Sequence, residues 1–206
     1  MHALHRFFYR LSKGMAYVGG ATLSALVGIV VLSIIGRELN SLLHADFIKT
    51  NMGGLADWIL GIRIPGLWGD IKLGPFNGDY ELVEAGMAFT IFAFLPLAHI
   101  SGAHASVDVF TSWLSDRQNR WLTMVIDILF ALVLVIIAVQ LYQGTLNKMD
   151  RGQTTFLLEF PIWWAYALSL IGAVISAVVS VYLALVRIAE AVTDRPIAPI
   201  GEGADH

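Results

Sequence analysis

The chain has 206 residues, of which 57% are hydrophobic and only 14% are charged, and its formal net charge is −3. A soluble domain has about 25% charged residues, and one of this length has no interior large enough for so much apolar surface. The negative charge excludes nucleic acid as a partner, and the absence of cysteine excludes disulfides, thiolate metal sites and cysteine catalysis. We therefore expect an integral membrane protein.

Four uncharged runs are each long enough to cross a bilayer or nearly so, at residues 14–36, 85–103, 128–147 and 160–186. About 20 apolar residues of helix span about 30 Å of hydrocarbon. The sequence predicts an all-α integral membrane fold, a single membrane domain over 1–206, with transmembrane helices at about 14–36, 82–103, 122–146 and 160–186. Interfacial amphipathic helices are expected beside them.

The first run is preceded by a basic segment without acids that contains Arg6, Arg10 and Lys13. A signal peptide is the alternative interpretation, but the run is too long and no small-residue cleavage context follows it. By the positive-inside rule the N-terminus is expected in the cytoplasm, and four spans bring the C-terminus to the same side.

The first loop, residues 37–79, is long and rich in glycine, and is expected on the side of the membrane opposite the termini. Within it, residues 55–60 are expected to form one or two turns of interfacial helix, and Trp58 and Trp68 suit the headgroup layer. The simplest interpretation is a loop that rests on the membrane surface. After the second span, apolar positions three and four apart at 105–121 predict a second helix lying in the membrane interface.

Small residues recur at four-residue spacing in two of the spans. The first span has Ala16, Gly20, Ser24 and Gly28, and the fourth has Gly172, Ser176, Ser180 and Ala184. Small residues on one ridge let helix backbones approach closely in lipid, so both ridges predict tight helix–helix contacts, within the chain or with a partner. The third span is nearly all branched and aromatic between 128 and 139, which suits lipid or a subunit interface.

The ionisable residues lie near the ends of the spans. Glu81 and Glu84 share a helix face and are candidates for a salt bridge to Arg37, with metal ligation or a proton site as alternatives. His104 and Asp108 share another face, where we expect an interfacial histidine oriented by the carboxylate. These five residues are candidates for structural ion pairs or a subunit interface.

Metal, haem and catalytic sites are not expected. Glu84 and His104 are about 30 Å apart along a helix, and His104 with Asp108 offers too few ligands for a metal. A di-haem cytochrome needs histidines facing each other from different spans, whereas the first, third and fourth spans contain none. No nucleophile–base pattern is present, so we expect neither an enzyme nor a bound cofactor.

Three short elements together resemble a known family. They are the stretch 78–84, the stretch 94–108 that includes Gly102, His104 and Asp108, and the stretch 152–166 that includes Gly152, Pro161 and Trp163. With Arg37 closing the first span, their order and spacing resemble the small membrane subunit, of DctQ type, of the tripartite ATP-independent periplasmic (TRAP) transporters. The resemblance covers about 14–186, and the long insertion at 40–77 departs from it.

The resemblance implies a role as a scaffold in the bacterial inner membrane. Its partners would be a large TRAP membrane subunit, which transports organic acids with a sodium gradient, a periplasmic substrate-binding protein and membrane lipids. In the inserted loop, the exposed aromatic and cationic residues would be candidates for docking the binding protein: Trp58, Arg63, Trp68 and Lys72.

Two other functions remain open from the residues alone. A small stand-alone transporter would need polar residues at the middle of the membrane or interrupted helices, and Pro96 is the only interior breaker. An anchor subunit of a membrane redox complex is disfavoured by the placement of the histidines.

Overall fold

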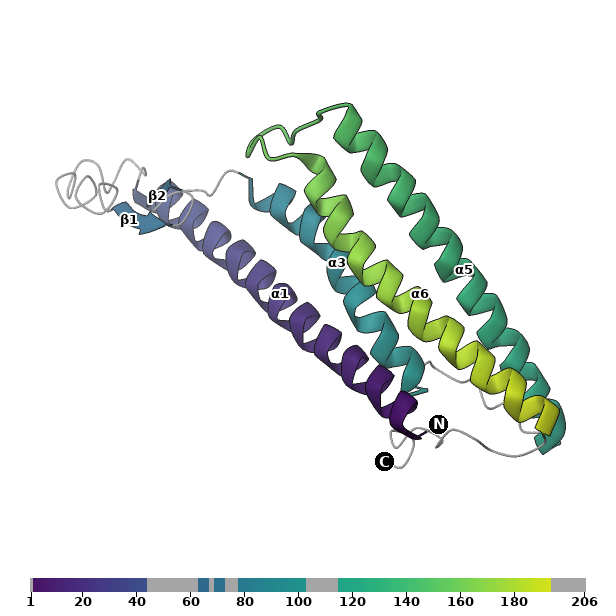
Figure 1. Cartoon of the computed structure of the whole chain (residues 1–206). Coiled ribbons are helices and arrows are strands. Elements are labelled where there is room, and N and C mark those ends of the chain that lie inside the picture. The colour runs from purple at the N-terminus through teal and green to yellow at the C-terminus, as the bar shows by residue number, and fades with distance from the viewer. Residues whose placement is uncertain (1, 44–62, 67–68, 73–77, 103–114, 194–206) are drawn as a thin grey trace.

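The computed structural model describes residues 2–43, 63–66, 69–72, 78–102 and 115–193. The described part contains four long helices, and a short antiparallel hairpin comes between the first two in sequence (Figure 1). The helices are α1 (His2–Leu43), α3 (Asp79–Ile100), α5 (Asp116–Asp150) and α6 (Ile162–Thr193), and the strands are β1 (Arg63–Gly66) and β2 (Gly69–Lys72). All four helices are long and apolar enough to span a membrane, which confirms the all-α membrane fold.

The four helices form a row rather than a closed bundle. α1 packs mainly on α3, α3 packs on α6, and α6 packs on α5, so α1 and α5 are the two outer members (Figure 1). The core lies between α3 and α6, where Ile100, Val179 and Leu183 are buried together. We call the end where α1 begins the N-terminal end of the row, and the end where residues 151–161 connect α5 to α6 the loop end.

Local signals set where two of the helices begin. Ser115 caps α5 with a capping box. The backbone N–H of Gln118 donates to the Ser115 hydroxyl, and the backbone N–H of Ser115 donates to the Gln118 side-chain oxygen. α3 begins after Gly78, whose φ of 113° belongs to the left-handed region. A Cβ at Gly78 would lie 2.6 Å from the Leu158 side chain, so only glycine fits there.

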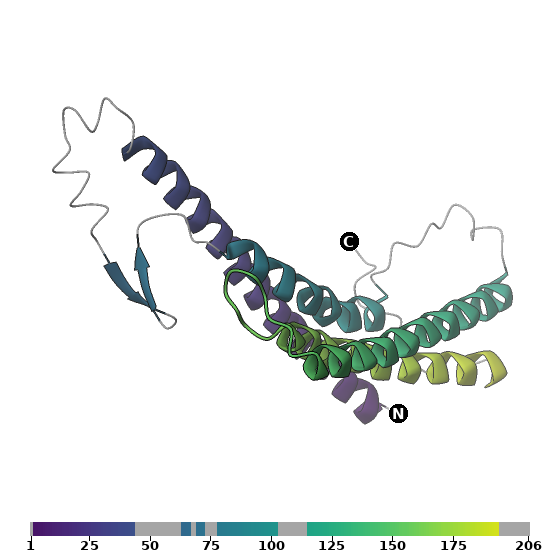
Figure 2. The same cartoon turned by 90° about the horizontal axis from the view of Figure 1, so that it is seen from above.

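α1 is longer than the first predicted span and continues past Arg37 to Leu43. Arg37 therefore does not end the helix. Residues 37–43, which the sequence analysis assigned to the first loop, belong to α1. Its C-terminal turns extend beyond the start of α3, and the hairpin lies apart from the four helices (Figure 2). Arg63 faces Lys72 across this hairpin. The predicted interfacial helix at 55–60 lies outside the described residues.

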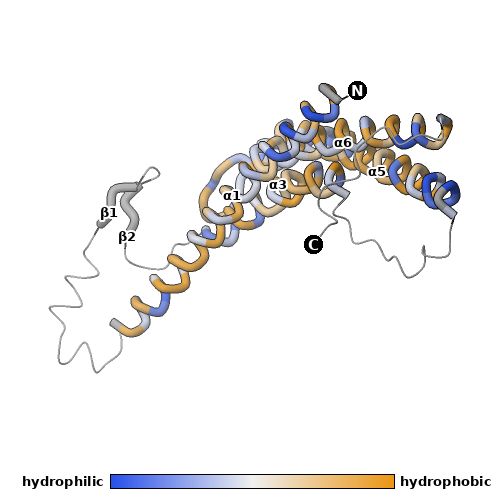
Figure 3. Tube along the Cα trace, turned by 90° about the horizontal axis from the view of Figure 1, so that it is seen from below, coloured by the Kyte–Doolittle hydropathy of each residue, from blue (hydrophilic) through white to orange (hydrophobic). Residues whose placement is uncertain are grey.

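The second predicted interfacial helix, over 105–121, is corrected in its C-terminal part. Residues 103–114 lie outside the described residues, but 116–121 form the first turns of α5 itself, beyond the Ser115 cap. The periodicity that suggested a separate amphipathic helix therefore belongs, in this part, to a long membrane helix that emerges from the bilayer. Figure 3 shows the same pattern, with hydrophilic residues gathered at the start of α5 and hydrophobic ones along its middle.

The two small-residue ridges have different outcomes. The ridge of α6 packs as expected, because Gly172, Ser176, Ser180 and Ala184 are all buried. Within the chain, the close approach of α1 to α3 is centred on Gly19 rather than on the predicted ridge: a Cβ at Gly19 would lie 2.8 Å from Ala93 Cβ, whereas one at Gly20 would lie 3.9 Å from the Phe94 ring. At Gly28 a Cβ would meet nothing within 4 Å. The seam of α1 instead has buried positions seven apart, at Ser12, Gly19, Leu26 and Ser33.

Candidate functional site: polar clasps at both ends of the helix row

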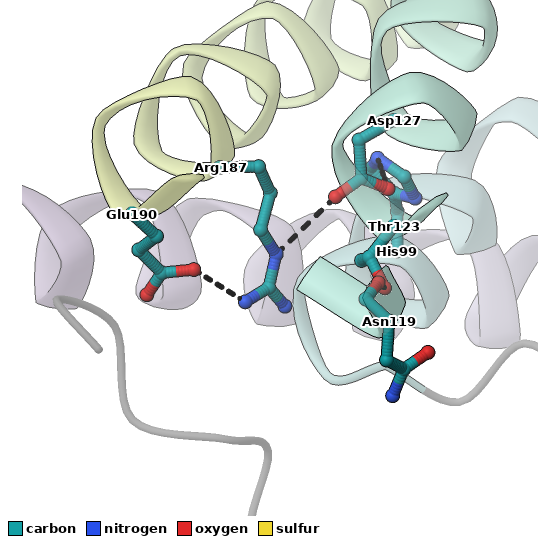
Figure 4. A network of polar contacts seen from close by, with 6 residues as sticks. All are labelled: His99, Asn119, Thr123, Asp127, Arg187 and Glu190. Carbon is teal, nitrogen blue, oxygen red and sulfur yellow. Dashed lines mark hydrogen bonds and ion pairs between the residues drawn. The ribbon is translucent and has the colours of Figure 1, made fainter. Parts of the chain in front are cut away.

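The N-terminal end of the row is held by a cluster of ionisable side chains from three helices, which we call the N-terminal clasp (Figure 4). Arg187 of α6 donates from Nε to Asp127 of α5 at 3.3 Å and from a terminal nitrogen to Glu190 at 2.7 Å. Nε2 of His99, on α3, lies 3.8 Å from the other Asp127 oxygen, and its ring stacks on Phe130 with the centroids 4.3 Å apart.

This clasp connects α3 and α5, two helices that otherwise barely touch. α6 lies between α3 and α5 in the row, and His99 and Asp127 connect the two across it. The side chains of His99 and Glu190 are almost fully buried, and that of Asp127 is 14% exposed. Buried charges are retained where they are paired, and removing one partner is strongly destabilising. The arrangement therefore fixes the relative positions of α3, α5 and α6 at this end.

The loop end is held by a second set of contacts, the loop clasp. A nitrogen of Arg37, on α1, lies 2.8 Å from the Asp79 carboxylate on α3. Glu81 accepts hydrogen bonds from the backbone N–H groups of Leu157 and Leu158 at 2.7 and 2.9 Å. These contacts tie α1 and the 151–161 loop to the first turn of α3.

The 151–161 loop is also braced internally. Thr154 and Pro161 form a β-bridge, the Thr155 amide donates to the Phe160 carbonyl at 3.0 Å, and Lys148 donates to the Gln153 side chain at 2.7 Å. A connection bonded in this way holds the ends of α5 and α6 in one position. Neither clasp contains a nucleophile with a base, and the described residues hold no group of acids and histidines that could bind a metal.

The predicted site residues are placed as follows. The acid that pairs with Arg37 is Asp79, rather than Glu81 or Glu84. Glu81 binds loop backbone instead, and Glu84 is exposed, without an ion pair to any described residue. His104, Asp108, Trp58 and Trp68 lie outside the described residues, and Arg63 and Lys72 belong to the hairpin.

Analysis of the sequence missed the N-terminal clasp. None of its four residues, His99, Asp127, Arg187 and Glu190, is among the candidate residues of the sequence analysis. Two signals pointed to the cluster: Asp127 directly precedes the uncharged run 128–147, and Arg187 directly follows the run 160–186. A lone acid and a lone base that border neighbouring spans on the same side of the membrane are candidates for a pair.

One comparison with known proteins identifies the family of this chain. The family model of the DctQ component of tripartite ATP-independent periplasmic transporters matches residues 72–191, more than half of the chain. The chain belongs to the DctQ family. No curated protein and no solved structure matches it.

Membership in the DctQ family makes this chain the small permease subunit of a TRAP transporter, a transport component and not an enzyme. The match begins at Lys72, so it includes α3, α5 and nearly all of α6 but excludes α1 and most of the long first loop. Both clasps are built largely from the matched region, with Arg37 as the contribution from outside it. The N-terminal clasp lies wholly within it.

Proposed function

We propose that this DctQ chain is the fixed scaffold beside the large membrane subunit of a sodium-driven, binding-protein-dependent carrier of organic acids. The observation that carries the proposal is the position of the charged groups. Between the two clasps none of the four helices has a charged side chain, because the uncharged runs 14–36, 85–98, 128–147 and 160–186 fill the interval. An ion or substrate path through this chain would need ionisable groups at that depth.

The continuity of the helices supports the same role. Transporters that bind substrate within the membrane commonly use discontinuous helices at the midplane. Each of the four described helices runs unbroken from end to end, and α3 continues through Pro96. With polar clasps at both ends, the row of helices is suited to be a fixed support for a neighbouring subunit that moves.

The distribution of charge supports an orientation in the bacterial inner membrane. Bases outnumber acids at the N-terminal end of the row, where the described bases are Arg6, Arg10, Lys13, Arg117, Arg120 and Arg187. Acids outnumber bases at the loop end, where the described acids of the helices and their connection are Glu38, Asp79, Glu81, Glu84, Asp150 and Glu159. The described bases at the loop end are fewer: Arg37, Lys148 and Arg151 in the helices and their connection, with Arg63 and Lys72 in the hairpin. We propose from the positive-inside rule that the N-terminal end faces the cytoplasm, with both termini on that side and the first loop in the periplasm.

The long first loop is proposed to dock the periplasmic substrate-binding protein through Trp58, Arg63, Trp68 and Lys72. The projection of α1 beyond α3 and the separate hairpin support this, since they extend the chain on the proposed periplasmic side (Figure 2). The test is to replace residues 50–74 with a short Gly/Ser linker. The membrane complex should still assemble while binding-protein-dependent uptake falls steeply. Full uptake would remove the docking role, and loss of assembly would indicate a brace between subunits.

The scaffold function is tested by reconstitution in liposomes with a sodium gradient and labelled organic acids. This chain alone should give no uptake, and uptake should require the large subunit together with the binding protein. Sodium-dependent uptake by this chain alone would contradict the proposal. A complex that transports without this chain would contradict it as well.

A further inference from the structure

One face of α5 carries three amide side chains inside or at the edge of the membrane. Gln140, Gln143 and Asn147 are spaced three and four residues apart, so they lie along one side of the helix. All three are exposed. None of them is hydrogen-bonded through its side chain to any described residue, so the row of helices itself does not satisfy these amides.

Gln140 is the deepest of the three. The uncharged part of α5 runs from residue 128 to residue 147, between Asp127 and Lys148. At 1.5 Å per residue, Gln140 lies about 20 Å from Asp127 and about 12 Å from Lys148 along the helix axis. It is therefore within the hydrocarbon layer, where lipid tails offer neither donors nor acceptors.

An unpaired amide at such a depth is costly, because transfer of a polar group out of water without a hydrogen bond is unfavourable even inside proteins. Polar residues within membrane helices accordingly face other helices or a water-filled cavity. α5 is an outer member of the row and packs mainly on α6. The amide face thus points to a neighbour outside the described residues that hydrogen-bonds at this level.

The amides continue a regular seam along α5. Toward the start of α5 the same side of the helix continues with Leu122, Ile126, Leu129, Val133 and Ile136. From residue 122 to residue 147 the spacing alternates between four and three residues. Every position of this seam is exposed. A repeat that averages 3.5 residues is the pattern by which one helix packs along another with a small crossing angle. The shape of the seam therefore fits a single long helix.

We infer that this seam of α5, residues 122–147, binds a transmembrane helix of the large TRAP membrane subunit, one with hydrogen-bonding side chains at the level of Gln140 to Asn147. The inference rests on the proposed function, since it names the surface by which the scaffold holds its partner. The amides set the register of the two helices and the apolar part of the seam supplies the contact area.

The first test replaces the three amides together, as Q140L/Q143L/N147L, and measures recovery of the complex after co-expression with the large subunit. Because up to three hydrogen bonds between membrane helices are lost together, the affinity should fall about tenfold or more. The matched control is Ile136→Leu, which changes the same seam without removing an amide and should leave recovery unchanged. Thermal unfolding of each variant alone checks that the row still folds.

The second test places a photo-reactive amino acid at Ile136 on the seam, or at Ile171, an exposed position of α6. The two positions are at similar depth, because α5 and α6 run antiparallel and Gly144 faces Tyr166. Ile136 should form an adduct with the large subunit. An adduct from Ile171 and none from Ile136 would overturn the inference, and so would an adduct joining two copies of this chain through Ile136.

The failure of this inference can be told from failure of the proposed function. If the wild-type chain does not co-purify with the large subunit, the proposed scaffold is wrong. If the wild type co-purifies and the triple amide variant does so equally well, the scaffold stands and the seam is not its binding surface.

Discussion

The hydroxyl of Ser176 on α6 lies 2.9 Å from the carbonyl oxygen of Phe92 on α3. Phe92 is the residue whose carbonyl would normally accept from the amide of residue 96, which is proline and has no N–H. Pro96 is buried inside α3, where no water can replace the missing donor. The serine of the neighbouring helix thus supplies the donor, a means by which proline is tolerated in membrane helices. The Gly172 carbonyl, 2.8 Å from the same hydroxyl, competes for its proton.

This relationship predicts that the effect of Ser176→Ala depends on residue 96. In the wild-type chain the substitution should lower the free energy of unfolding by about 1 kcal/mol, because it leaves the Phe92 carbonyl without a donor. In a Pro96→Ala background the backbone amide at position 96 regains its N–H and can donate to Phe92, so the cost should shrink. Reversible unfolding in detergent mixtures measures both values.

The control for that cycle is Ser180→Ala, one turn further along α6. Ser180 is equally buried, but its hydroxyl has no hydrogen-bond partner among the described residues. Its loss should change the stability little in either background. Equal costs for Ser176→Ala with and without Pro96 would show that the Phe92 contact does not compensate for the proline.

Glycine substitutions should distinguish the ridge of α6, which packs on α3 at Gly172, from the ridge of α1 at Gly28, although the sequence pattern of the two ridges is the same. Gly172→Ala places a Cβ 2.9 Å from the Phe92 Cβ and should cost about 1–3 kcal/mol, since α3 and α6 must separate. Gly28→Ala meets nothing within 4 Å and should leave the unfolding of the isolated chain unchanged. Equal stability of the two variants would contradict the close approach at Gly172.

The N-terminal clasp predicts a charge-dependent rescue. Arg187→Met removes the cation shared by Asp127 and Glu190 and should destabilise the chain by about 3 kcal/mol. Neutralising both acids in the same chain, as D127N/E190Q, should restore part of the loss. The matched control is Arg117→Met, an exposed arginine at the same end of the row, which should have little effect. No rescue by the double neutralisation would mean that Arg187 acts through packing alone.

The loop clasp predicts a local change in amide exchange. Glu81→Ala removes the acceptor of the Leu157 and Leu158 N–H groups, so hydrogen exchange at these two amides should accelerate. Glu84→Ala, three residues later on α3 and exposed, should leave both rates unchanged. Unchanged exchange in both variants would show that the loop is held without the carboxylate.

The orientation predicts which ends label from outside the cell, and the chain has no cysteine of its own to interfere. Asn119→Cys and Asp150→Cys introduce thiols at exposed positions at the two ends of α5. An impermeant maleimide added to intact spheroplasts should react at position 150 and spare position 119, until the membrane is opened. The reverse pattern would invert the topology.

Several features could be predicted from the sequence because they depend on local composition. Hydropathy and span length identified four membrane helices, and three short elements with Arg37 indicated the DctQ family. The packing ridge of α6 was also predictable, since small residues recur every four positions along its buried face. On α1 the same argument chose Gly20 and Gly28 over Gly19. Adjacent small residues present more than one face, and only the neighbouring α3 selects the one that packs.

The ion pairs required the tertiary structure for a different reason. The sequence places three acids, Asp79, Glu81 and Glu84, at the start of the second span, on the side of the membrane where the first span ends. Each step of one residue along a helix turns the side chain by about 100°, so the sequence does not say which acid faces Arg37. The rotation of α3 against α1 and the loop thus decided that Asp79 meets Arg37 while Glu81 meets loop backbone. The sequence by itself determined that this protein lies in the membrane and belongs to a transporter. The order of the helices in the row, and the polar groups that meet at its ends, depended on contacts between residues far apart in the chain, which local patterns do not encode.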